Sequence, residues 1–239
     1  MTVNNTVYGN TVEIIVQAGE NQTGFVEILV NGKTYVEELD QGMAKFYIDG
    51  LDAKDNYTVN VTYFENEIYH SNVNSTVFNV TKANMTATVV AQNVTVEQNP
   101  TFLIDDVTSD FKGNVTIVID GHVYYNGTVK SYIEIERILQ AANYTANVTF
   151  YGDSNYNDKS YLVNFTVSRV DTTIDVTIDD VTYPANASAA VTVSNNANGT
   201  IEIYLNETLV GSGAIVNGQT VINLTRLSAG AKEVTVKFI

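Results

Sequence analysis

Apolar and polar side chains alternate in several short runs of this chain. Val26–Val30 and Val115–Ile119 place an aliphatic residue at every second position, and Thr58–Thr62 follows the same period. A period of two puts neighbouring side chains on opposite faces of an extended backbone, so these runs predict half-buried β-strands. Asn31-Gly32 and Asp120-Gly121 follow the first two runs directly. Such pairs supply the positive φ angles that a tight hairpin turn needs.

Three further pairs are turn candidates: Asp49-Gly50, Asn126-Gly127 and Asn217-Gly218. Only Tyr132–Ala142 has a spacing of apolar residues typical of a helix. The stretch that matches it elsewhere in the chain, Lys45–Ala53, is patterned as a strand followed by a turn. We therefore expect at most one helical turn within Tyr132–Ala142, in a chain that is otherwise all-β.

The chain carries an internal repeat. Leu51-Asp-Ala53 recurs as Leu139-Gln-Ala141 and as Leu227-Ser-Ala229, each 88 positions after the one before. Gly24–Tyr35 also matches Gly113–Tyr124, and a weaker third copy begins at Gly199. Several markers in one register indicate a tandem array. We predict three domains, in residues 1–82, 83–169 and 170–239.

Each repeat has room for about seven short strands, which is typical of an immunoglobulin-like β-sandwich. The chain contains no Cys and no Trp, so aliphatic residues, Phe and Tyr must form the cores. Tyr57 and Tyr144 stand at the start of the penultimate strand, where a tyrosine corner belongs. The alternative is that these tyrosines only fill the start of the strand. Lys232 occupies the third position, so the third repeat lacks this device and is expected to be the least stable.

Composition narrows the range of partners. Against 12 Lys and Arg the chain has 27 Asp and Glu, a net charge of -15, which argues against nucleic acid and anionic membranes. The absence of Cys excludes disulfides and thiolate chemistry. No apolar stretch is long enough to span a membrane, and no leader is visible at Met1. The chain is thus either cytosolic or an internal piece of an exported protein.

The run from Asn143 to Tyr156, Asn-Tyr-Thr-Ala-Asn-Val-Thr-Phe-Tyr-Gly-Asp-Ser-Asn-Tyr, followed by Phe165-Thr-Val167, resembles bacterial Ig-like repeat domains. It is more similar still to the tandem repeats of archaeal, methanogen adhesin-like surface proteins. The first repeat departs from the pattern at Glu65-Asn66. The resemblance implies a β-sandwich, an extracellular, cell-surface location and a role in adhesion or in a stalk. It transfers no catalytic residue.

The ends of the chain and its linkers suggest an arrangement. The linkers Val80–Asn84 and Val167–Asp171 contain no Gly or Pro, which favours an extended rod of tandem sandwiches. The first repeat is expected to lack part of its first strand, and the third to lack everything that aligns with Gly152–Val167. We expect a fragment of a longer array. The alternative is a filament or surface-layer subunit that self-associates, by taking a donated strand at the open sheet edge of the third repeat.

Modification and metal binding follow from polar residues. The Asn-x-Ser/Thr sequence occurs 17 times. Either the protein is densely N-glycosylated, with Asn21, Asn126 and Asn198 as the best turn sites, or the alternation of strands creates the sequence without any sugar. The acidic clusters that are candidates for calcium are Asp105-Asp106 with Asp110, Asp175 with Asp179-Asp180, and Asp153 with Asp158. None has the spacing of a calcium loop, so we predict solvated acidic turns, no metal site and no cofactor.

Catalysis has little support. The two histidines, His70 and His122, lie in different repeats, and no nucleophile, zinc or phosphate-loop motif occurs, so we expect no enzyme. A binding surface is the remaining hypothesis. Aromatic and short polar residues gather at two places, and we predict ligand contacts at Tyr124, Tyr125, Asp153, Asn155 and Tyr156. The expected partner is a protein or glycan on a host or neighbouring cell. The alternative is that these tyrosines cap the ends of the sandwiches.

Overall fold

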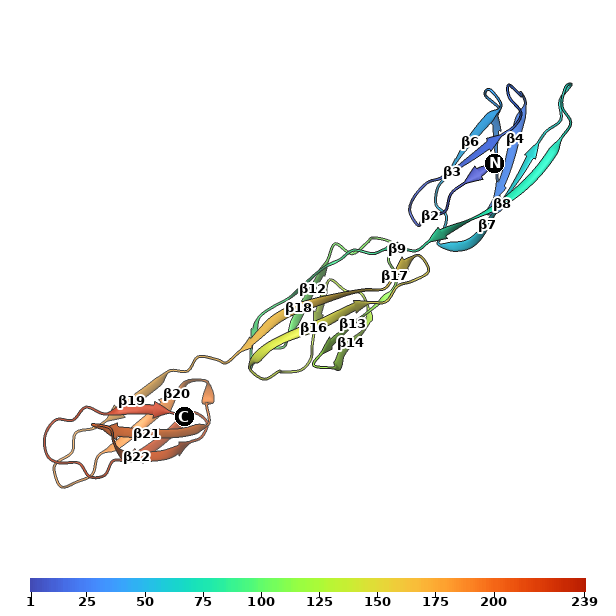
Figure 1. Ribbon diagram of the computed structural model, residues 1–239. Coiled ribbons are helices and arrows are strands. Elements are labelled where there is room, and N and C mark those ends of the chain that lie inside the picture. The colour runs from blue at the N-terminus through green and yellow to red at the C-terminus, as the bar shows by residue number, and fades with distance from the viewer. The chain divides into compact units, whose positions relative to one another are not determined.

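The computed structural model describes residues 1–239, with the exception of the Asn195 side chain. The chain is all-β and divides into two compact units, Met1–Arg169 and Val170–Ile239. The first unit contains two separate hydrophobic cores and the second contains one. We refer to residues 1–82, 83–169 and 170–239 as repeats 1, 2 and 3, and Figure 1 shows their strands in chain order.

Repeat 1 packs a three-stranded sheet, β1-β3-β6, against a five-stranded sheet, β2-β8-β7-β4-β5. The alternation of apolar and polar residues explains why the two sheets pack together: in β6, every second side chain is buried between them. The strands are β1 (Thr2–Val3), β2 (Thr6–Val7), β3 (Val12–Gln17), β4 (Phe25–Val30), β5 (Lys33–Glu38), β6 (Met43–Ile48), β7 (Lys54–Tyr63) and β8 (Asn72–Thr81).

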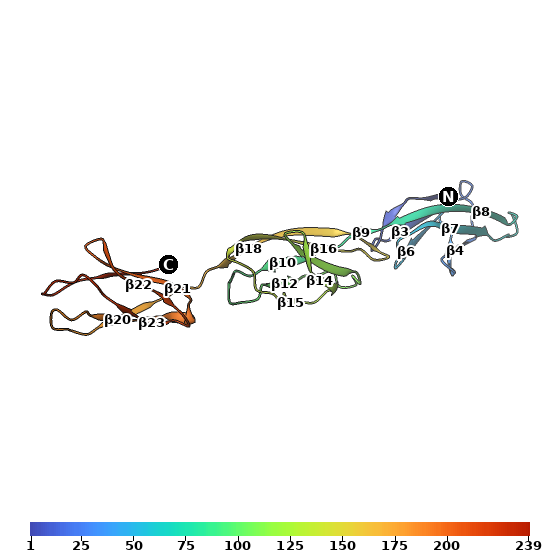
Figure 2. The ribbon, with the colours of Figure 1, turned by 90° about the horizontal axis from the view of Figure 1, so that it is seen from below.

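Repeat 2 has the same two sheets, in the orders β10-β12-β15 and β11-β18-β16-β13-β14. Figure 2 shows β12 and β15 on one side of this repeat and β16 and β18 on the other. A short parallel pair, β9 with β17, is added to this plan. The strands are β9 (Ala83–Asn84), β10 (Thr88–Ala91), β11 (Val94–Thr95), β12 (Thr101–Asp105), β13 (Asn114–Ile119), β14 (His122–Thr128), β15 (Tyr132–Glu134), β16 (Ala142–Phe150), β17 (Tyr156–Asn157) and β18 (Lys159–Ser168).

Repeat 3 forms two three-stranded sheets, β19-β20-β23 and β22-β21-β24. Its central strand β21 pairs with β22 and β24, as β13 pairs with β14 and β16 in repeat 2. The elements are β19 (Ile174–Ile178), β20 (Ser188–Val193), the 3-10 turn η1 (Ser194–Asn196), β21 (Gly199–Leu205), β22 (Thr208–Ile215), β23 (Gln219–Asn223) and β24 (Thr235–Phe238). The chain is therefore a series of immunoglobulin-like β-sandwiches.

Most turn predictions are confirmed and one is wrong. Asn31-Gly32, Asp120-Gly121 and Asn217-Gly218 all adopt positive φ at both residues. Asn126-Gly127 is not a turn, because Asn126 lies inside β14 and pairs with Thr116. No helical turn forms within Tyr132–Ala142. Ile133 and Ile135 are buried there at a spacing of two, which is a strand period, and β15 accounts for the first part.

Both predicted tyrosine corners are confirmed. The Tyr57 hydroxyl donates to the Asp52 carbonyl oxygen at 3.1 Å, and the Tyr144 hydroxyl donates to that of Gln140 at 3.0 Å. Each hydroxyl therefore fastens the preceding connection to the start of a central strand. In repeat 3 the Lys232 ammonium donates to the Ala229 carbonyl oxygen at 3.3 Å, so a lysine bonds to the corresponding connection there.

Candidate functional site: the junction loop

The residues Gly152–Asp158, here called the junction loop, connect β16 to β18 in repeat 2 and include β17. The Asp153 carboxylate organises this loop from inside. Its Oδ1 accepts the N–H groups of Asn155 at 2.8 Å and Tyr156 at 3.0 Å, and its Oδ2 accepts the Lys112 N–H at 2.8 Å. One carboxylate thereby satisfies three backbone donors of an irregular segment.

These bonds also determine the charge state of Asp153. Burial acts to raise the pKa of this carboxyl, but the N–H groups of Lys112, Asn155 and Tyr156 together outweigh burial and hold its pKa below the ordinary value. Hydrogen bonds to the charged form favour that form. Asp153 is thus a carboxylate at neutral pH, as three donors require.

Gly152 opens the loop at a position without room for a side chain. A Cβ at this position would overlap the Tyr156 carbonyl oxygen and come within 3.1 Å of the Asp158 nitrogen. The Gly152 N–H donates to Asp158 Oδ1 at 2.7 Å and closes the loop across its base. The Gly152-Asp153 pair of the sequence motif therefore has a structural reason: Gly152 allows a tight loop, and the Asp153 carboxylate accepts the backbone N–H groups inside it.

The loop binds repeat 1 mainly through Asn155. Asn155 Oδ1 accepts the Ala53 N–H at 2.8 Å, and Asn155 Nδ2 donates to Asp52 Oδ1 at 3.0 Å. The Asn155 carbonyl oxygen accepts the Ala83 N–H at 2.9 Å. One asparagine thus contacts both the connection before β7 and the linker after β8. Both ends of its amide are matched by a partner of the opposite kind.

The linker between the first two repeats is bonded to the junction loop through Lys82 and through the residues that follow it. The Lys82 ammonium donates to the Asp153 carbonyl oxygen at 2.5 Å. The next residues, Ala83–Asn84, form β9 and pair in parallel with Tyr156–Asn157. Asn157 Nδ2 also donates to Asn84 Oδ1 at 3.1 Å. The polypeptide between the first two repeats is therefore held as a strand.

A carboxylate shared by two tyrosines completes the junction. Asp110 Oδ2 accepts the Tyr8 hydroxyl at 2.7 Å, and Asp110 Oδ1 accepts the Tyr156 hydroxyl at 2.6 Å. The two rings meet edge to face, with centroids 5.4 Å apart. The bonds from Tyr156 and Tyr8 hold the pKa of Asp110 below its ordinary value. Burial, followed by the bond to Asp110, raises the pKa of Tyr156, so the pair is a neutral donor and a charged acceptor.

The predicted ligand residues fall into two groups. Asp153, Asn155 and Tyr156 come together in the junction loop, where their polar groups bond to the protein itself, and the Tyr156 side chain is only 6% exposed. Tyr124 and Tyr125 lie on the edge strand β14, half-buried. No hydrogen bond or ring contact among the described residues joins these two to the loop.

Tyr124 and Tyr125 each have a cation of the same repeat near the ring. The Arg137 guanidinium lies 5.8 Å from the Tyr124 centroid and the Lys130 ammonium 5.9 Å from that of Tyr125. The Tyr125 hydroxyl donates to the Thr128 carbonyl oxygen at 2.7 Å. Their contact with a ligand stays a prediction, and a stacking sugar would compete with these cations.

The glycosylation candidates are all exposed in the structure. Asn21 has a φ of 56° in the connection between β3 and β4. Asn126 lies within β14, and Asn198 precedes β21, where its Oδ1 accepts the Asn217 N–H at 2.9 Å. Among the described side chains, no group of three or more His, Cys, Asp or Glu is placed to hold a metal ion. In the same residues, no helix is long and apolar enough to cross a membrane.

The sequence analysis gave no junction role to Tyr8, Asp52, Lys82 and Asp110, and it considered Asp110 only within an acidic cluster. Their junction partners lie 46 to 103 positions away in the sequence, and patterns within one strand carry no information about such pairs. Lys82 alone had a signal, because it lies in the predicted linker Val80–Asn84.

No protein-family model and no curated protein sequence matches this chain. Several solved structures have a similar arrangement of strands. The fibronectin(III)-like modules of Clostridium thermocellum CbhA are 16% identical, cover 70% of this chain and 94% of their own, and give a TM-score of 0.28. The central fibronectin-III array of RIM-binding protein is 12% identical, covers 97% and 87%, and gives 0.28. The chicken CNTN1 FN1–FN3 domains are 8% identical, cover 93% and 89%, and give 0.32. The fold assignment above depends on the strand order of each repeat.

Proposed function

We propose that this chain is a non-catalytic stretch of an exported surface protein, in which the Ig-like repeats form a spacer that presents an adhesive part to another cell. The observation that carries the proposal is the junction loop. The residues with the composition of a binding surface are used within the protein. The Asn155 side chain bonds to Ala53 and Asp52 of repeat 1, the Asp153 carbonyl oxygen accepts the Lys82 ammonium, and the Tyr156 hydroxyl shares the Asp110 carboxylate with Tyr8. Their chemistry serves the connection between repeats.

A spacer must resist bending where one repeat meets the next. At this junction the linker is bonded through Lys82 and Ala83, the preceding connection through Ala53, and the start of repeat 1 through Tyr8. These bonds come from three separate places: the linker, the connection before β7, and the segment between β2 and β3. A hinge motion that separates the repeats must therefore break bonds at places far apart in the sequence. The default expectation for neighbouring domains is relative motion, and this network opposes it.

Composition supports the surface location in this proposal. A net charge of -15 keeps repeats apart from one another and from anionic polymers. The 17 Asn-x-Ser/Thr sequences, with exposed Asn21, Asn126 and Asn198, suit a glycoprotein outside the cell. The partner would be a protein or glycan of a host or neighbouring cell, bound by the adhesive part.

A second candidate is that the repeats are adhesive themselves. The observation in its favour is the half-buried pair Tyr124 and Tyr125 on the edge strand β14, beside Val123, which is 63% exposed. Saturable binding of the whole chain to cells or glycans that is lost in Tyr124→Ala and Tyr125→Ala would favour this role. Such a result would assign adhesion to β14 and leave the junction as its support.

The spacer is tested by the distance distribution between spin labels in repeats 1 and 2. The chain has no Cys, so exposed Thr34 of β5 and Leu162 of β18 can be replaced by labelled cysteines. We expect one narrow distribution. Asn155→Ala should broaden it, because it removes the side-chain bonds to Ala53 and Asp52.

Asn60→Ala is the matched control, since Asn60 is exposed on β7 and its side chain makes no hydrogen bond among those of the described residues. This variant should leave the distribution narrow. A broad distribution in the unmodified chain would contradict the spacer, because the junction bonds would then not restrain the repeats.

A further inference from the structure

The surface of repeat 1 that receives the junction loop consists of Tyr8, Asp52, Ala53 and Lys82, here called the loop seat. Its main contacts are generic. The Ala53 N–H and the Lys82 ammonium donate to the loop, at 2.8 Å to Asn155 Oδ1 and 2.5 Å to the Asp153 carbonyl oxygen. Any surface that presents a free N–H beside a cation in this geometry can receive the same loop.

Repeat 2 has a corresponding surface at the equivalent end. Equivalent hydrogen bonds in the two repeats show which residues correspond. The Val96 N–H donates to the Ser168 carbonyl oxygen at 2.9 Å, as the Tyr8 N–H donates to that of Thr81 at 2.8 Å. Val96 therefore corresponds to Tyr8, and Arg169, which follows Ser168, corresponds to Lys82.

The tyrosine corners identify the residues of repeat 2 that correspond to the other two residues of the loop seat. The Gln140 carbonyl oxygen accepts the Tyr144 hydroxyl as the Asp52 carbonyl oxygen accepts that of Tyr57. Gln140 therefore corresponds to Asp52, and Ala141 corresponds to Ala53.

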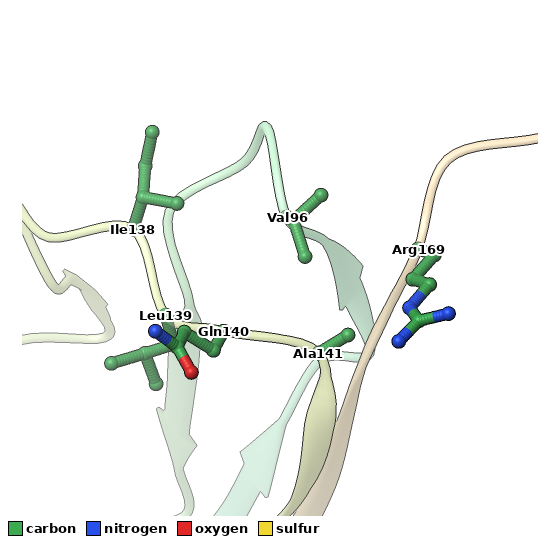
Figure 3. A pocket seen from close by; sticks show the side chains of 6 residues that line it. All are labelled: Val96, Ile138, Leu139, Gln140, Ala141 and Arg169. Atoms are coloured by element: carbon green, nitrogen blue, oxygen red, sulfur yellow. The ribbon is translucent and has the colours of Figure 1, made fainter. Parts of the chain in front are cut away.

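These four residues surround a shallow pocket of about 430 Å³. Figure 3 shows its lining, which is Val96, Ile138, Leu139, Gln140, Ala141 and Arg169. Ile138 is 58% exposed, a large apolar side chain without cover. The Ala53 N–H is bonded to Asn155, whereas no hydrogen bond of the described residues uses the Ala141 N–H. The pocket thus has a free donor, a cation and an apolar wall.

We propose that this pocket is a second loop seat, and that its occupant is a Gly-Asp-x-Asn-Tyr loop of an Ig-like repeat. The Asn side chain of that loop accepts the Ala141 N–H. The Arg169 guanidinium donates to the Asp carbonyl oxygen, and its planar fork offers more donors than Lys82. The Gln140 side-chain oxygen replaces the Asp52 carboxylate as acceptor for the Asn amide.

The apolar residues of the pocket predict one difference between the two seats. Val96 has no hydroxyl, so this seat makes no bond like that of Tyr8 to Asp110. The tyrosine ring of the loop packs on Val96 and Ile138 instead, covering an aliphatic surface that is now exposed.

The occupant is not the Gly152–Tyr156 loop of another copy, because those residues are bonded to repeat 1 of their own chain. Residues 170–239 contain no Gly-Asp-x-Asn-Tyr sequence. The loop is therefore not supplied by residues 170–239, and the first test places one directly after β24, where repeat 2 has its junction loop after β16. This inference rests on the contacts within repeats 1 and 2 and does not depend on the spacer role.

The first test supplies such a loop. A chain that carries the sequence of residues 152–168 again after Ile239 continues β24 as β16 continues into the junction loop. The readout is amide hydrogen exchange by NMR. We expect the Ala141 amide to exchange about tenfold more slowly, the change that one hydrogen bond of about 1.4 kcal/mol produces. Replacing the Asn of the added loop by Ala should reverse the change, while the Ala53 amide stays constant. Slowed β24 amides with an unchanged Ala141 amide would overturn the proposal.

A second test needs no added segment. The triple variant Tyr8→Val, Asp52→Gln and Lys82→Arg gives the seat of repeat 1 the residues of repeat 2, opposite a loop known to bind. The Ala53 amide should exchange faster than in the original chain, because the Tyr8–Asp110 bond is lost. It should still exchange about tenfold more slowly than in Asn155→Ala. Exchange as fast as in Asn155→Ala would show that these residues do not hold the loop, and the proposal would be wrong even if the added segment failed to pair with β24.

Discussion

The two tyrosine corners use the same bond in different surroundings, which allows its contribution to stability to be measured. Tyr57→Phe and Tyr144→Phe remove one hydroxyl each and keep the ring, so the stacking on Phe78 and Phe165, with centroids 5.4 Å apart in both cases, is preserved. The expected loss is therefore that of the hydrogen bond alone. Its size depends on how well water can replace the hydroxyl.

The two tyrosines differ in how deeply they are buried. Tyr57 is 4% exposed, and its removed hydroxyl leaves the Asp52 carbonyl oxygen with little access to water on that side. Tyr144 is half-buried and its bond lies at the surface. We expect Tyr57→Phe to lower the free energy of unfolding of repeat 1 by about 1.5 kcal/mol, and Tyr144→Phe to lower that of repeat 2 by about 0.5 kcal/mol.

The assay must resolve single repeats, because a chain with several domains does not unfold in one step. Native-state hydrogen exchange of core amides in β7 and β16 reports each repeat separately. Exchange of the slowest β7 amides should rise about tenfold in Tyr57→Phe, and that of the β16 amides about twofold in Tyr144→Phe. Tyr35→Phe is the control, since Tyr35 packs against the same core and its hydroxyl makes no hydrogen bond among the described residues. Equal effects of the two corner variants, or none, would refute the argument from burial.

Two further predictions concern the junction. Gly152→Ala should broaden the distance distribution between repeats 1 and 2, because the new Cβ overlaps the Tyr156 carbonyl oxygen. Gly19→Ala is the control and should leave the distribution narrow, because a Cβ there meets only the flexible Gln22 side chain. A narrow distribution in Gly152→Ala would contradict the loop geometry. The junction should also loosen in acid. The pKa values of Asp110 and Asp153 are lowered in the folded protein, so their contribution is fully present above the ordinary carboxyl pKa of about 4 and is lost as the pH falls through the lower folded values. The same distribution should therefore stay narrow from pH 6 down to the ordinary carboxyl pKa of about 4 and broaden only below it. Broadening that begins above that pH would show that carboxylates with lowered pKa values do not hold the junction.

Local patterns were sufficient to predict most of the architecture. The alternation in Val26–Val30 predicts β4, because one face of that strand is buried and every second residue must be apolar. The pair Asn31-Gly32 predicts its turn for an equally local reason, the positive φ at both residues. The corners at Tyr57 and Tyr144 were predictable because donor and acceptor lie only five and four positions apart.

Local patterns were misleading where a neighbouring strand decides the outcome. Asn126-Gly127 has turn composition, but β13 pairs with β14 along its whole length and keeps both residues in the strand. A bulge in the pairing between Ile117 and Val118 shifts the register and accommodates the extra residue. The apolar spacing in Tyr132–Ala142 suggests a helix only when Ile133 and Ile135 are ignored, and both are buried against the core of repeat 2.

The candidate site also separates what local sequence predicts from what depends on distant partners. Composition singled out Asp153, Asn155 and Tyr156, yet composition cannot distinguish a loop that binds a foreign ligand from one that binds the next domain, since both need amides, a carboxylate and an aromatic ring. What separates them is the location of the partner. Here it is repeat 1, reached by bonds that span 102 positions for Ala53 to Asn155 and for Tyr8 to Asp110.

If the pocket of repeat 2 is a loop seat, as proposed above, the chemistry of the junction shows which sequence differences between the two seats it tolerates. Two of the bonds that the junction loop receives come from backbone N–H groups, that of Ala53 in repeat 1 and that of Ala83 in the linker, which every residue except proline supplies. The third is a cation that either Lys82 or an arginine at that position provides. The side chains of Tyr8 and Asp52 are therefore free to become Val96 and Gln140 without loss of the main contacts. The information that specifies the connection lies in the loop, where Gly152, Asp153 and Asn155 each have a role that no other residue type fills as well.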